Sequence, residues 1–484
     1  MAHLKLMSFK TLLQVFTCFS LFFIAFQLNA QKDFASLGSL EISDKQYWDM
    51  TTDEAGRLTV IYGSRERRNF RLYDASGELT YAHVLKEGYG SIVPGPYAHL
   101  TDDEKLVYFF PPRENKYDLE RIVVYKNEDK ATAEQIRLSK KKIRILVAFT
   151  LGQSMVCITQ DKKTKGLGYF RVYIDGQTEE GELKPDQAVV ADLLRSGKHY
   201  QEVKSGQSLE PEQLISANKV YPQDERNIYV TLDPDNEEDR GRIELLKIDL
   251  EAKTISYKRL LNEHTTNKWA VRSFVFGKRL FRLVVEPRMF DLAAFSLEDL
   301  TPEKQFHYEP EGTFDLNSSK VLRTGSVDFF GFDKLDETVK NTGDILKYIA
   351  RGRPILSVEQ QQNGLIAVKP GSLLDKSKNN TTFGVFSLTN GGNTICFGVP
   401  MRTAPATKRL TITKFVTLLN SNDLSKSTQS FSFPGSDAQI RQYVRLNKRK
   451  LTSLFTYQYK ENKRLLALEN IKTGEVKLVA FRGF

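Results

Sequence analysis

The chain of 484 residues is poor in the residue types that usually build local chemical sites. It has 3 cysteines, 6 histidines and 2 tryptophans. No His-x-x-x-His or Cys-x-x-Cys spacing occurs, so a local zinc motif is excluded and we expect no bound metal. A Gly-x-Ser-x-Gly elbow, a phosphate-binding P-loop and an EF-hand calcium loop are also lacking. We therefore assign no cofactor and no catalytic residue from local motifs.

Long hydrophobic runs are scarce as well. The longest runs from Thr11 to Phe26, which is shorter than the roughly 20 residues that a membrane-spanning helix needs. Two lysines precede it and a small residue, Ala30, closes a short polar segment after it, which is the pattern of a secretory signal peptide. We expect residues 1–30 to be removed, no transmembrane anchor, and export to the periplasm or the cell surface. An exported chain is not expected to bind nucleic acid.

Charge of one sign does not dominate the chain. The formal net charge is +10, from 70 basic and 60 acidic residues that are interspersed along the sequence. A mixed surface of this kind mainly supports solubility, and it does not by itself indicate a polyanionic partner.

The most informative pattern is a hairpin phrase that recurs seven times. Each copy has a β-rich run, an acidic residue or Asn, a few turn residues and a second β-rich run. Asp, Asn and Gly tolerate turn conformations, and the flanking β-branched and aromatic residues suit strands. The anchor residues are Asp74, Asn127, Asp175, Asp249, Glu298, Asn390 and Asn470.

Two further apolar runs precede each hairpin. The nearer runs are residues 58–62, 106–110, 155–159, 228–232, 280–285, 365–368 and 451–457. The more distant and weaker runs are residues 46–50, 97–100, 143–149, 219–221, 269–276, 355–359 and 442–446. Four antiparallel strands repeated in one order indicate a β-propeller, whose blades bury their faces against neighbouring blades. We predict an all-β, seven-bladed β-propeller with short helical insertions; six or eight blades, or two tandem β-sandwiches, are the alternatives.

With these repeats, most of the chain after the leader resembles bacterial secreted propeller proteins with WD40-like or quinoprotein-like blades. The resemblance implies a single propeller domain over residues 31–484. The Gly-His and Trp-Asp marks of WD40 blades do not recur from repeat to repeat, and Trp48 and Trp269 are too few for the periodic docking marks of quinoprotein blades. The resemblance therefore indicates an architecture and no specific functional family.

The repeat also decides how the two cysteines of the mature chain are interpreted. Cys157 falls in the third repeat and Cys396 in the sixth, and both lie inside apolar strands. Their Cα atoms should be much farther apart than the roughly 7 Å that a disulfide permits. We therefore expect two free thiols, although an even pair of cysteines in an exported protein would otherwise suggest a disulfide.

Two long insertions, residues 184–218 and residues 309–354, interrupt the repeat. Within the first, residues 187–198 suit a short amphipathic helix. Within the second, residues 334–350 suit another helix, with Asp333 as its N-cap. Connections between blades and loops between second and third strands emerge on the same face of a propeller, so we expect the insertions to share that face and to carry function.

Side chains on the innermost strands are the candidate ligand-binding residues, because these strands border the central channel. Aromatic rings and arginine forks there can receive a sugar, a carboxylate or an acidic peptide. The candidates are His99, Arg144, Tyr221, Trp269, Arg272, Glu359 and Tyr443. The alternative is that these side chains pack between blades or line the channel as ordinary solvated groups.

From these observations we predict a secreted, monomeric, non-catalytic propeller that binds a protein or glycan partner in the cell envelope. The alternative is a glycan lyase or hydrolase whose acid, base and arginine come from several blades around the channel mouth. A deep pocket that gathers His99 or Glu359 with a carboxylate and an arginine would favour the enzyme.

Overall fold

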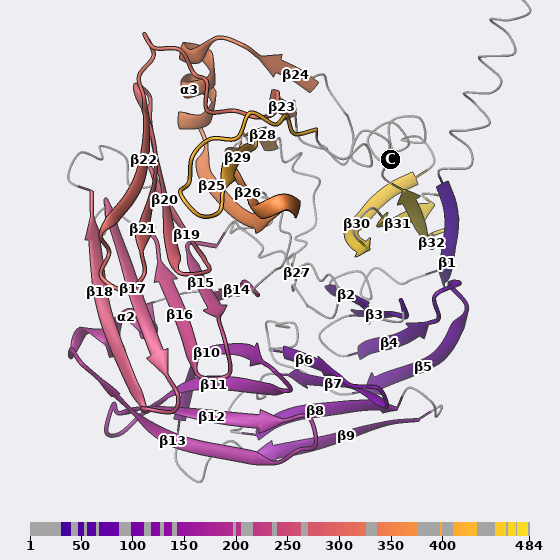
Figure 1. The fold of residues 1–484 in the computed structure, drawn as a ribbon. Coiled ribbons are helices and arrows are strands. Elements are labelled where there is room, and N and C mark those ends of the chain that lie inside the picture. The colour runs from indigo at the N-terminus through magenta and orange to yellow at the C-terminus, as the bar shows by residue number, and fades with distance from the viewer. Residues whose placement is uncertain are drawn as a thin grey trace, which may run out of the picture.

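Antiparallel sheets follow one another around a common centre in the computed structural model of the chain (Figure 1). The structure describes residues 31–39, 47–52, 56–63, 67–86, 98–110, 118–125, 130–137, 143–196, 200–204, 216–234, 240–262, 270–325, 336–375, 397–398, 410–432, 451–460, 463–470 and 472–482. Strands are the dominant elements among these residues, and neither α-helix among them is long and apolar enough to cross a membrane. The arrangement is that of a β-propeller, as the repeat predicts.

The first two sheets along the chain each contain four consecutive antiparallel strands. The first sheet has β2 (Tyr47–Thr52), β3 (Leu58–Gly63), β4 (Arg67–Tyr73) and β5 (Leu79–Lys86), and β27 (Phe397–Gly398) pairs with β2. The second has β6 (Ala98–Thr101), β7 (Lys105–Phe110), β8 (Asp118–Tyr125) and β9 (Lys130–Arg137). In both sheets the first strand lies nearest the centre of the ring and the last lies outside (Figure 1).

The third and fourth groups of four strands are joined into one sheet. The third has β10 (Ile143–Leu151), β11 (Ser154–Asp161), β12 (Leu167–Tyr173) and β13 (Thr178–Pro185). The fourth has β15 (Asn218–Pro222), β16 (Asn227–Leu232), β17 (Arg242–Asp249) and β18 (Thr254–Leu261). The outer strands β13 and β18 pair in parallel, and β14 (Tyr200–Glu202) pairs in parallel with β15 on the inner edge. Helix α2 (Val189–Ser196) lies between β13 and β14, where the sequence predicts a short helix.

The fifth sheet is regular, whereas the sixth combines distant segments. The fifth has β19 (Val271–Phe276), β20 (Arg279–Glu286), β21 (Met289–Ser296) and β22 (Pro302–Tyr308). The sixth has β23 (Val321–Gly325), β24 (Asp336–Val339), β25 (Arg353–Gln360), β26 (Leu365–Asp375), β28 (Leu410–Lys414) and β29 (Thr417–Asn420), with the short 3-10 helix η3 (Gln362–Gly364) between β25 and β26. Its order is β24-β23-β28-β26-β25, with β29 also paired to β26, so part of the insertion at 309–354 belongs to the sheet. The hairpin predicted around Asn390 lies outside the described residues.

The second predicted helix is shorter than the sequence pattern indicates. Residues 336–339 form β24, because they pair with β23, and α3 (Thr342–Ala350) begins only after them. Its N-cap is Asn341, whose side chain accepts a hydrogen bond from the backbone N–H of Gly343 at 2.9 Å. The prediction of Asp333 as the N-cap of this helix is therefore wrong. The apolar face predicted for the helix is confirmed in α3, where its aliphatic side chains are buried.

The last sheet unites the two ends of the described chain. Its strands are β30 (Leu451–Lys460), β31 (Lys463–Asn470), β32 (Glu475–Arg482) and β1 (Gln31–Ser39), in the order β1-β32-β31-β30. The N-terminal strand β1 pairs antiparallel with β32, and β32 is therefore not the exposed edge strand of this sheet. The run at 442–446, predicted as the innermost strand, lies outside the described residues.

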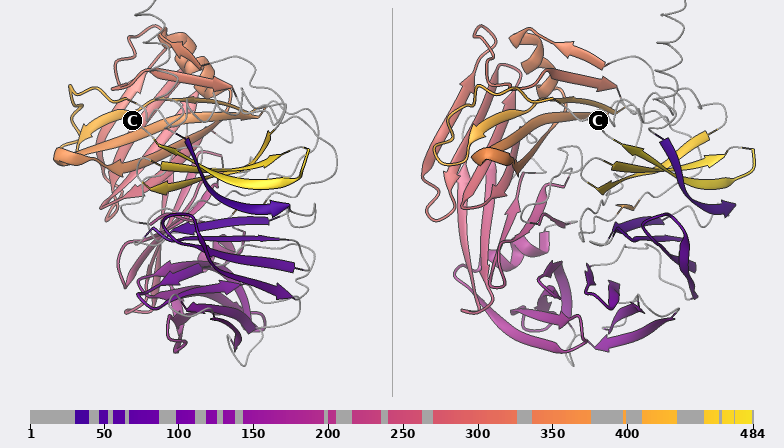
Figure 2. Two further views of the ribbon diagram at one scale, coloured as in Figure 1. Left: turned by 90° about the vertical axis from the view of Figure 1, so that its right-hand side faces the viewer. Right: turned by 45° about the vertical axis from the view of Figure 1, so that its right-hand side comes forward.

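Both faces of the inner strands are buried, which explains why their sequences are continuously apolar. In β7, Leu106, Tyr108 and Phe110 pack against the first sheet, whereas Val107 and Phe109 pack against the third. Successive side chains of a strand point to opposite faces, so a run buried on both sides needs no polar alternation. Figure 2 shows neighbouring sheets stacked face to face around the ring. A two-sheet sandwich would have left one face of each sheet polar.

The cysteine in the described part of the third sheet behaves as the repeat predicts. Cys157 is a free, fully buried thiol, and burial raises its pKa to about 12. Cys396 lies outside the described residues.

Carboxylates close several of the predicted hairpin turns. Asp74 Oδ1 accepts hydrogen bonds from the Ser76 hydroxyl at 2.7 Å and from the backbone N–H groups of Ser76 at 2.8 Å and Glu78 at 2.9 Å. These donors, the hydroxyl first, lower the pKa of Asp74. Asp299 and Asp423 form similar turns, and hydroxyl and backbone donors lower their pKa values in the same way.

We expect these turns to make the fold sensitive to acid. A carboxylate whose pKa is lower in the folded chain contributes stability above its unfolded pKa of 3.8, and this contribution is lost as the pH falls through the folded value. The urea concentration at the midpoint of unfolding should therefore decrease as the pH is lowered below about 4. The triple variant Asp74→Asn, Asp299→Asn, Asp423→Asn should show a shallower fall, because Asn Oδ1 keeps the turn but does not titrate. An equally steep fall in the triple variant would contradict this assignment.

Candidate functional site

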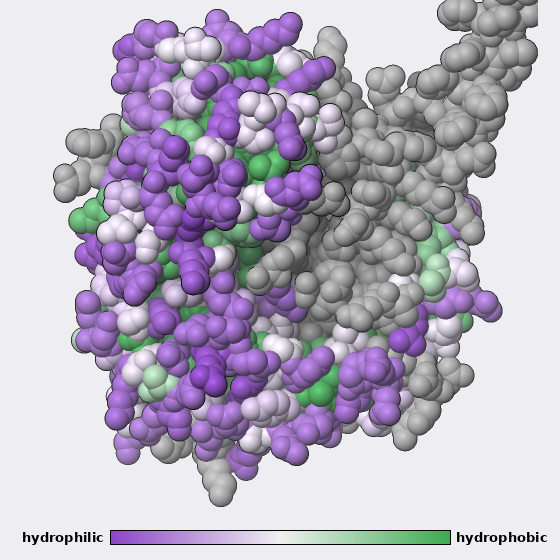
Figure 3. Space-filling model, in the orientation of Figure 1, coloured by the Kyte–Doolittle hydropathy of each residue, from purple (hydrophilic) through white to green (hydrophobic). Residues whose placement is uncertain are grey.

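Polar side chains dominate the described surface in the orientation of Figure 3, and hydrophobic residues form only small separate areas there. The large hydrophobic side chains that are exposed in the described residues are Leu79, Val84, Val189 and Leu261, from β5, α2 and β18. These four side chains come from three different elements, so they are not one apolar stripe of a single strand or helix. A site on this surface is therefore better defined by polar groups in a cavity than by a broad apolar face.

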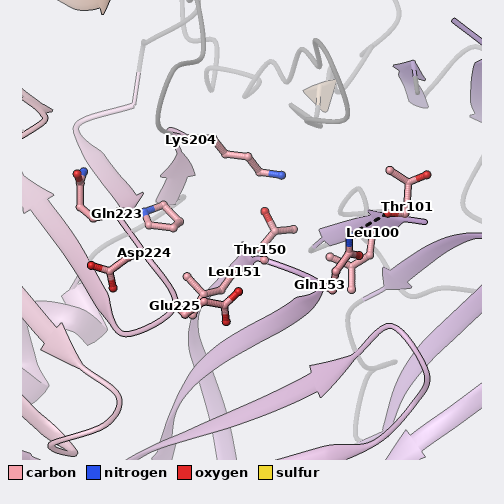
Figure 4. Close-up of a pocket in the computed structure, with 11 residues that line it drawn as sticks. Leu100, Thr101, Thr150, Leu151, Gln153, Lys204, Gln223, Asp224 and Glu225 are labelled. Atoms are coloured by element: carbon pink, nitrogen blue, oxygen red, sulfur yellow. Dashed lines mark hydrogen bonds between the residues drawn. The ribbon is translucent and has the colours of Figure 1, made fainter. Parts of the chain in front are cut away.

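One such cavity, of about 500 Å³, lies where the inner ends of the second, third and fourth groups of strands meet (Figure 4). Its described lining comes from the end of β6, the β10–β11 turn, the segment after β14 and the β15–β16 turn. The residues are Leu100, Thr101, Thr150, Leu151, Gly152, Gln153, Lys204, Pro222, Gln223, Asp224 and Glu225. We call this cavity the inner-turn pocket.

The insertion at 184–218 reaches the pocket through β14. Parallel strands end at the same edge of a sheet, so the chain leaving β14 arrives beside the end of β15. The Glu202 carboxylate accepts a hydrogen bond from the backbone N–H of Thr150 at 2.9 Å and another from the Thr150 hydroxyl. Lys204 Nζ lies 3.7 Å from Glu202 Oε1. These contacts fix the insertion to the third group of strands and place Lys204 in the pocket wall.

The β10–β11 turn and the β15–β16 turn, on the side of the pocket away from Lys204, are held by an ion pair and by hydrogen bonds. Glu225 Oε2 lies 2.5 Å from the Arg171 guanidinium of β12. Gly152, at φ +54°, lets this carboxylate approach, because a Cβ there would lie 2.0 Å from Glu225 Oε1. On the second group of strands, Gln153 Nε2 donates a hydrogen bond to the Thr101 carbonyl at 3.2 Å. The pocket walls therefore come from several sheets and are joined to one another by these contacts.

Asp224 supplies an exposed carboxylate of the pocket, next to the exposed Glu225. Its Oδ1 accepts hydrogen bonds from the backbone N–H groups of Arg226 and Asn227, both at 2.8 Å. Partial burial opposes ionisation, but these N–H donors and the nearby positive charge outweigh it and lower the pKa of Asp224. Asp224 is therefore negatively charged at neutral pH.

A second polar group lies buried between the fourth and fifth groups of strands. Lys219 Nζ is 2.8 Å from Asp233 Oδ2, and their side chains are 1% and 0% exposed. Asp233 also accepts hydrogen bonds from the Ser273 backbone N–H at 3.1 Å and hydroxyl at 2.5 Å. Burial lowers the pKa of Lys219, and the Asp233 charge opposes this change. This group acts as a polar tie between the two groups of strands.

Three of the predicted ligand-binding residues are buried in such contacts. Tyr221 packs edge-to-face on Phe274 with ring centroids 5.6 Å apart, and burial raises its pKa. The Arg272 guanidinium, on the strand that also carries Ser273, donates to the Val271 carbonyl at 2.8 Å and, at 3.4 Å, to a second backbone carbonyl.

The third of these residues lies in a separate ion pair. Glu359 Oε2 is 2.9 Å from Lys369 Nζ, and both side chains are buried in the sixth sheet. Glu359 Oε1 also accepts a hydrogen bond from Gln361 Nε2 at 2.7 Å. Neither Glu359 nor the other two buried candidates is among the described residues that line the inner-turn pocket.

The structure describes the other four predicted ligand-binding residues only in part. Arg144 is exposed near the start of β10, away from the β10–β11 turn that lines the pocket. The backbone of His99 lies in β6, one residue before the pocket lining, and its side chain is outside the described part. Trp269 and Tyr443 are also outside it. No group of three or more His, Cys, Asp or Glu side chains within the described ranges could hold a metal ion.

The pocket residues were not among the sequence-based candidates. The insertions were expected to gather on the face of the connections between blades, whereas the inner-turn pocket lies at the turns between first and second strands. A usable signal was present, because these short turns are rich in polar residues, as in residues 101–105 and 222–227. The sequence pattern does not show which turns of different sheets lie next to one another.

No family model and no curated protein matches the sequence. Among solved structures, an oligogalacturonate lyase from Vibrio parahaemolyticus is similar at 9% identity, with a TM-score of 0.36 over 93% of this chain and 96% of that one. The Dos1 propeller is similar at 8% identity, with a TM-score of 0.30 over 88% and 78%. A cobalt-substituted ACO from Synechocystis shares 10% identity, with a TM-score of 0.28 over 54% of this chain and 61% of that one. This chain thus spans less than two thirds of the Synechocystis protein.

Propeller proteins are among these similar structures, and none of the comparisons indicates a specific family. Identities of about one residue in ten and TM-scores below 0.5 carry no argument about ligand or reaction.

Proposed function

We propose that the chain is a seven-bladed propeller, exported as a monomer, that binds a protein or glycan partner in the cell envelope without catalysis. The blade count is supported by seven groups of strands, namely β2–β5, β6–β9, β10–β13, β15–β18, β19–β22, the sheet of β25 and the sheet that β1 completes. The signal-peptide pattern of residues 1–30 supports export.

The observation that carries the binding function is the inner-turn pocket. Its volume of about 500 Å³ lies within the range of small-ligand sites, and its lining combines polar and charged side chains with Leu100, Leu151 and Pro222. The turns that line it are fixed to neighbouring sheets by Glu202, Arg171 and Gln153. A pocket with fixed walls loses little conformational entropy when a ligand binds.

The described residues give less support to a glycan lyase or hydrolase. The carboxylate expected to act there, Glu359, is paired with Lys369. Within the pocket, Glu225 is paired with Arg171 and Asp224 is held by turn amides. The pKa of Asp224 is lowered, whereas a general acid at neutral pH requires a raised pKa.

Blocking the pocket tests the proposal. Gln223 is a lining residue in the β15–β16 turn (Figure 4), and the larger indole of Gln223→Trp should narrow the pocket. We expect this variant of the mature protein to recover at most about a tenth of the partner that the unmodified protein captures from envelope extracts. Gln177→Trp, in the exposed β12–β13 turn, is the matched control and should capture as much as the unmodified protein. Equal capture by both variants would exclude the pocket as the binding site.

A further inference from the structure

The charged side chains of the inner-turn pocket are compensated within the protein. Lys204 Nζ lies 3.7 Å from Glu202 Oε1, and the Arg171 guanidinium lies 2.5 Å from Glu225 Oε2. Both oxygens of Asp224 accept hydrogen bonds from inside its own turn. A charged ligand would lose its hydration and would find these groups already bonded to protein partners. The described lining therefore favours a ligand without net charge.

The lining also consists of turns and strand ends rather than the length of a strand. It includes the β10–β11 turn, the β15–β16 turn and the end of β6. Backbone groups of these turns bond within the protein: the Gln223 N–H donates to the Asn227 carbonyl at 3.0 Å, and the Gln153 carbonyl accepts from the Ile174 N–H at 2.9 Å. An extended peptide binds mainly to a row of backbone groups at a sheet edge. The described lining has no such row, so its side chains must recognise the ligand.

Two of these side chains keep a hydrogen-bond acceptor on either side of Gly152. Among the described residues only Arg171 bonds to Glu225, through Oε2, which leaves Oε1 as an acceptor. A Cβ on Gly152 would lie 2.0 Å from Glu225 Oε1, so this oxygen lies directly against the β10–β11 turn. Gln153, the next residue in that turn, uses its side-chain N–H on the Thr101 carbonyl and keeps its Oε1 (Figure 4).

The Gln223 amide adds a group that both donates and accepts. Its side chain has no hydrogen-bond partner within the described part of the chain, and it lines the same cavity. Sugar hydroxyls match this set of groups, because each hydroxyl donates one hydrogen bond and can accept others. Leu100, Leu151 and Pro222 provide apolar surface for the C–H groups of a sugar ring.

We propose that the inner-turn pocket binds a neutral glycan, whose hydroxyl groups donate hydrogen bonds to Glu225 Oε1 and Gln153 Oε1. The inference rests on the proposed binding function and specifies the ligand of that same site. Arg171 holds the Glu225 carboxylate in place and balances its charge, so the carboxylate acts as a fixed acceptor rather than as a counter-ion.

Calorimetry of the unmodified mature protein with defined probes tests the proposal. The uncharged probes are maltotriose, cellotriose and triacetylchitotriose, and at least one of them should bind. Its Kd should change less than about twofold between about 50 mM and about 500 mM NaCl, because no ion pair with the ligand forms. The anionic trigalacturonate and the uncharged peptide N-acetyl-trialanine amide should each bind at least about tenfold more weakly.

Three variants locate the bound trisaccharide. Glu225→Ala removes one acceptor and should weaken binding about tenfold. Gly152→Ala should weaken it to a similar extent, because the added Cβ displaces the Glu225 carboxylate. Glu182→Ala removes an exposed carboxylate of β13 and is the matched control, which should bind as the unmodified protein does. Circular dichroism of each variant checks that it is folded.

The outcomes separate this inference from the proposed function. Tighter binding of trigalacturonate or of the peptide overturns the neutral glycan, and so does a trisaccharide that binds equally well to Gln223→Trp. If no trisaccharide binds while Gln223→Trp still abolishes capture from extracts, the pocket binds another class of ligand and the inference fails alone. If no trisaccharide binds and Gln223→Trp leaves capture unchanged, both proposals fail. The comparison of probes needs no variant, so a variant that does not fold leaves the test intact.

Discussion

Asp233→Ala is expected to lower the free energy of unfolding by about 3–5 kcal/mol, which is the usual cost of removing one partner of a buried ion pair. The substitution leaves the Lys219 ammonium, 1% exposed, without its carboxylate in a region that water does not reach. It also removes the acceptor of two hydrogen bonds from Ser273, which join the fourth and fifth groups of strands. Urea unfolding followed by circular dichroism measures the change.

Two further variants make this expectation specific. Asp33→Ala removes an exposed pair, since Asp33 and Lys477 are 64% and 44% exposed, and it should cost about 1 kcal/mol or less. The double variant Asp233→Leu, Lys219→Met should recover part of the loss, because an apolar pair of similar size removes the uncompensated charge. A single Asp233→Ala variant as stable as Asp33→Ala would show that the buried pair contributes little.

Leu37→Ala is expected to open the ring at the seam between the two ends of the chain. Leu37 is 2% exposed in β1, the strand that covers β32, and truncating a buried leucine costs about 2–5 kcal/mol. Because β1 pairs only with β32 among the described strands, the lost stability should appear as local opening of this edge. Amide hydrogen exchange in β32 should accelerate at least about tenfold, whereas exchange in β11 should change little.

A matched substitution on another outer strand provides the control. Leu79 in β5 is 45% exposed, and Leu79→Ala should leave exchange in β32 unchanged. A synthetic peptide of residues 31–39, added to a chain that lacks them, should restore slow exchange in β32, since it can pair with the uncovered edge. Fast exchange in β32 despite the peptide would mean that β1 does not close the ring by strand pairing.

The inner three strands of the regular sheets were predictable from the sequence because a run of apolar residues indicates a strand that is buried in the sheet stack. Residues 106–110 are apolar at every position, and β7 packs against two neighbouring sheets. The hairpin at Asp74 was predictable because a short-range carboxylate contact builds it. The helix at 187–198 followed from its amphipathic period, as α2 shows. Each of these signals depends on residues close together in the chain.

The sixth sheet and the candidate site could not be predicted in this way. The neighbours β23 and β28 are 85 or more residues apart in sequence, and no local pattern states that they pair. The pocket needs turns from three groups of strands, brought side by side by the curvature of the ring. Among the predicted ligand-binding residues, Tyr221 and Arg272 instead became buried contacts between blades, because strand alternation turned them toward a neighbour.

The sequence by itself determined that this chain is an all-β repeat of four-stranded units with short helices and a free thiol at Cys157, since strand burial, turn chemistry and amphipathic period are encoded over a few residues. The tertiary structure alone decided that the N-terminal strand completes the last sheet, that Lys219 meets Asp233, and that turns from three groups of strands line one pocket. These features join segments far apart in the chain, so they exist only once the ring has closed.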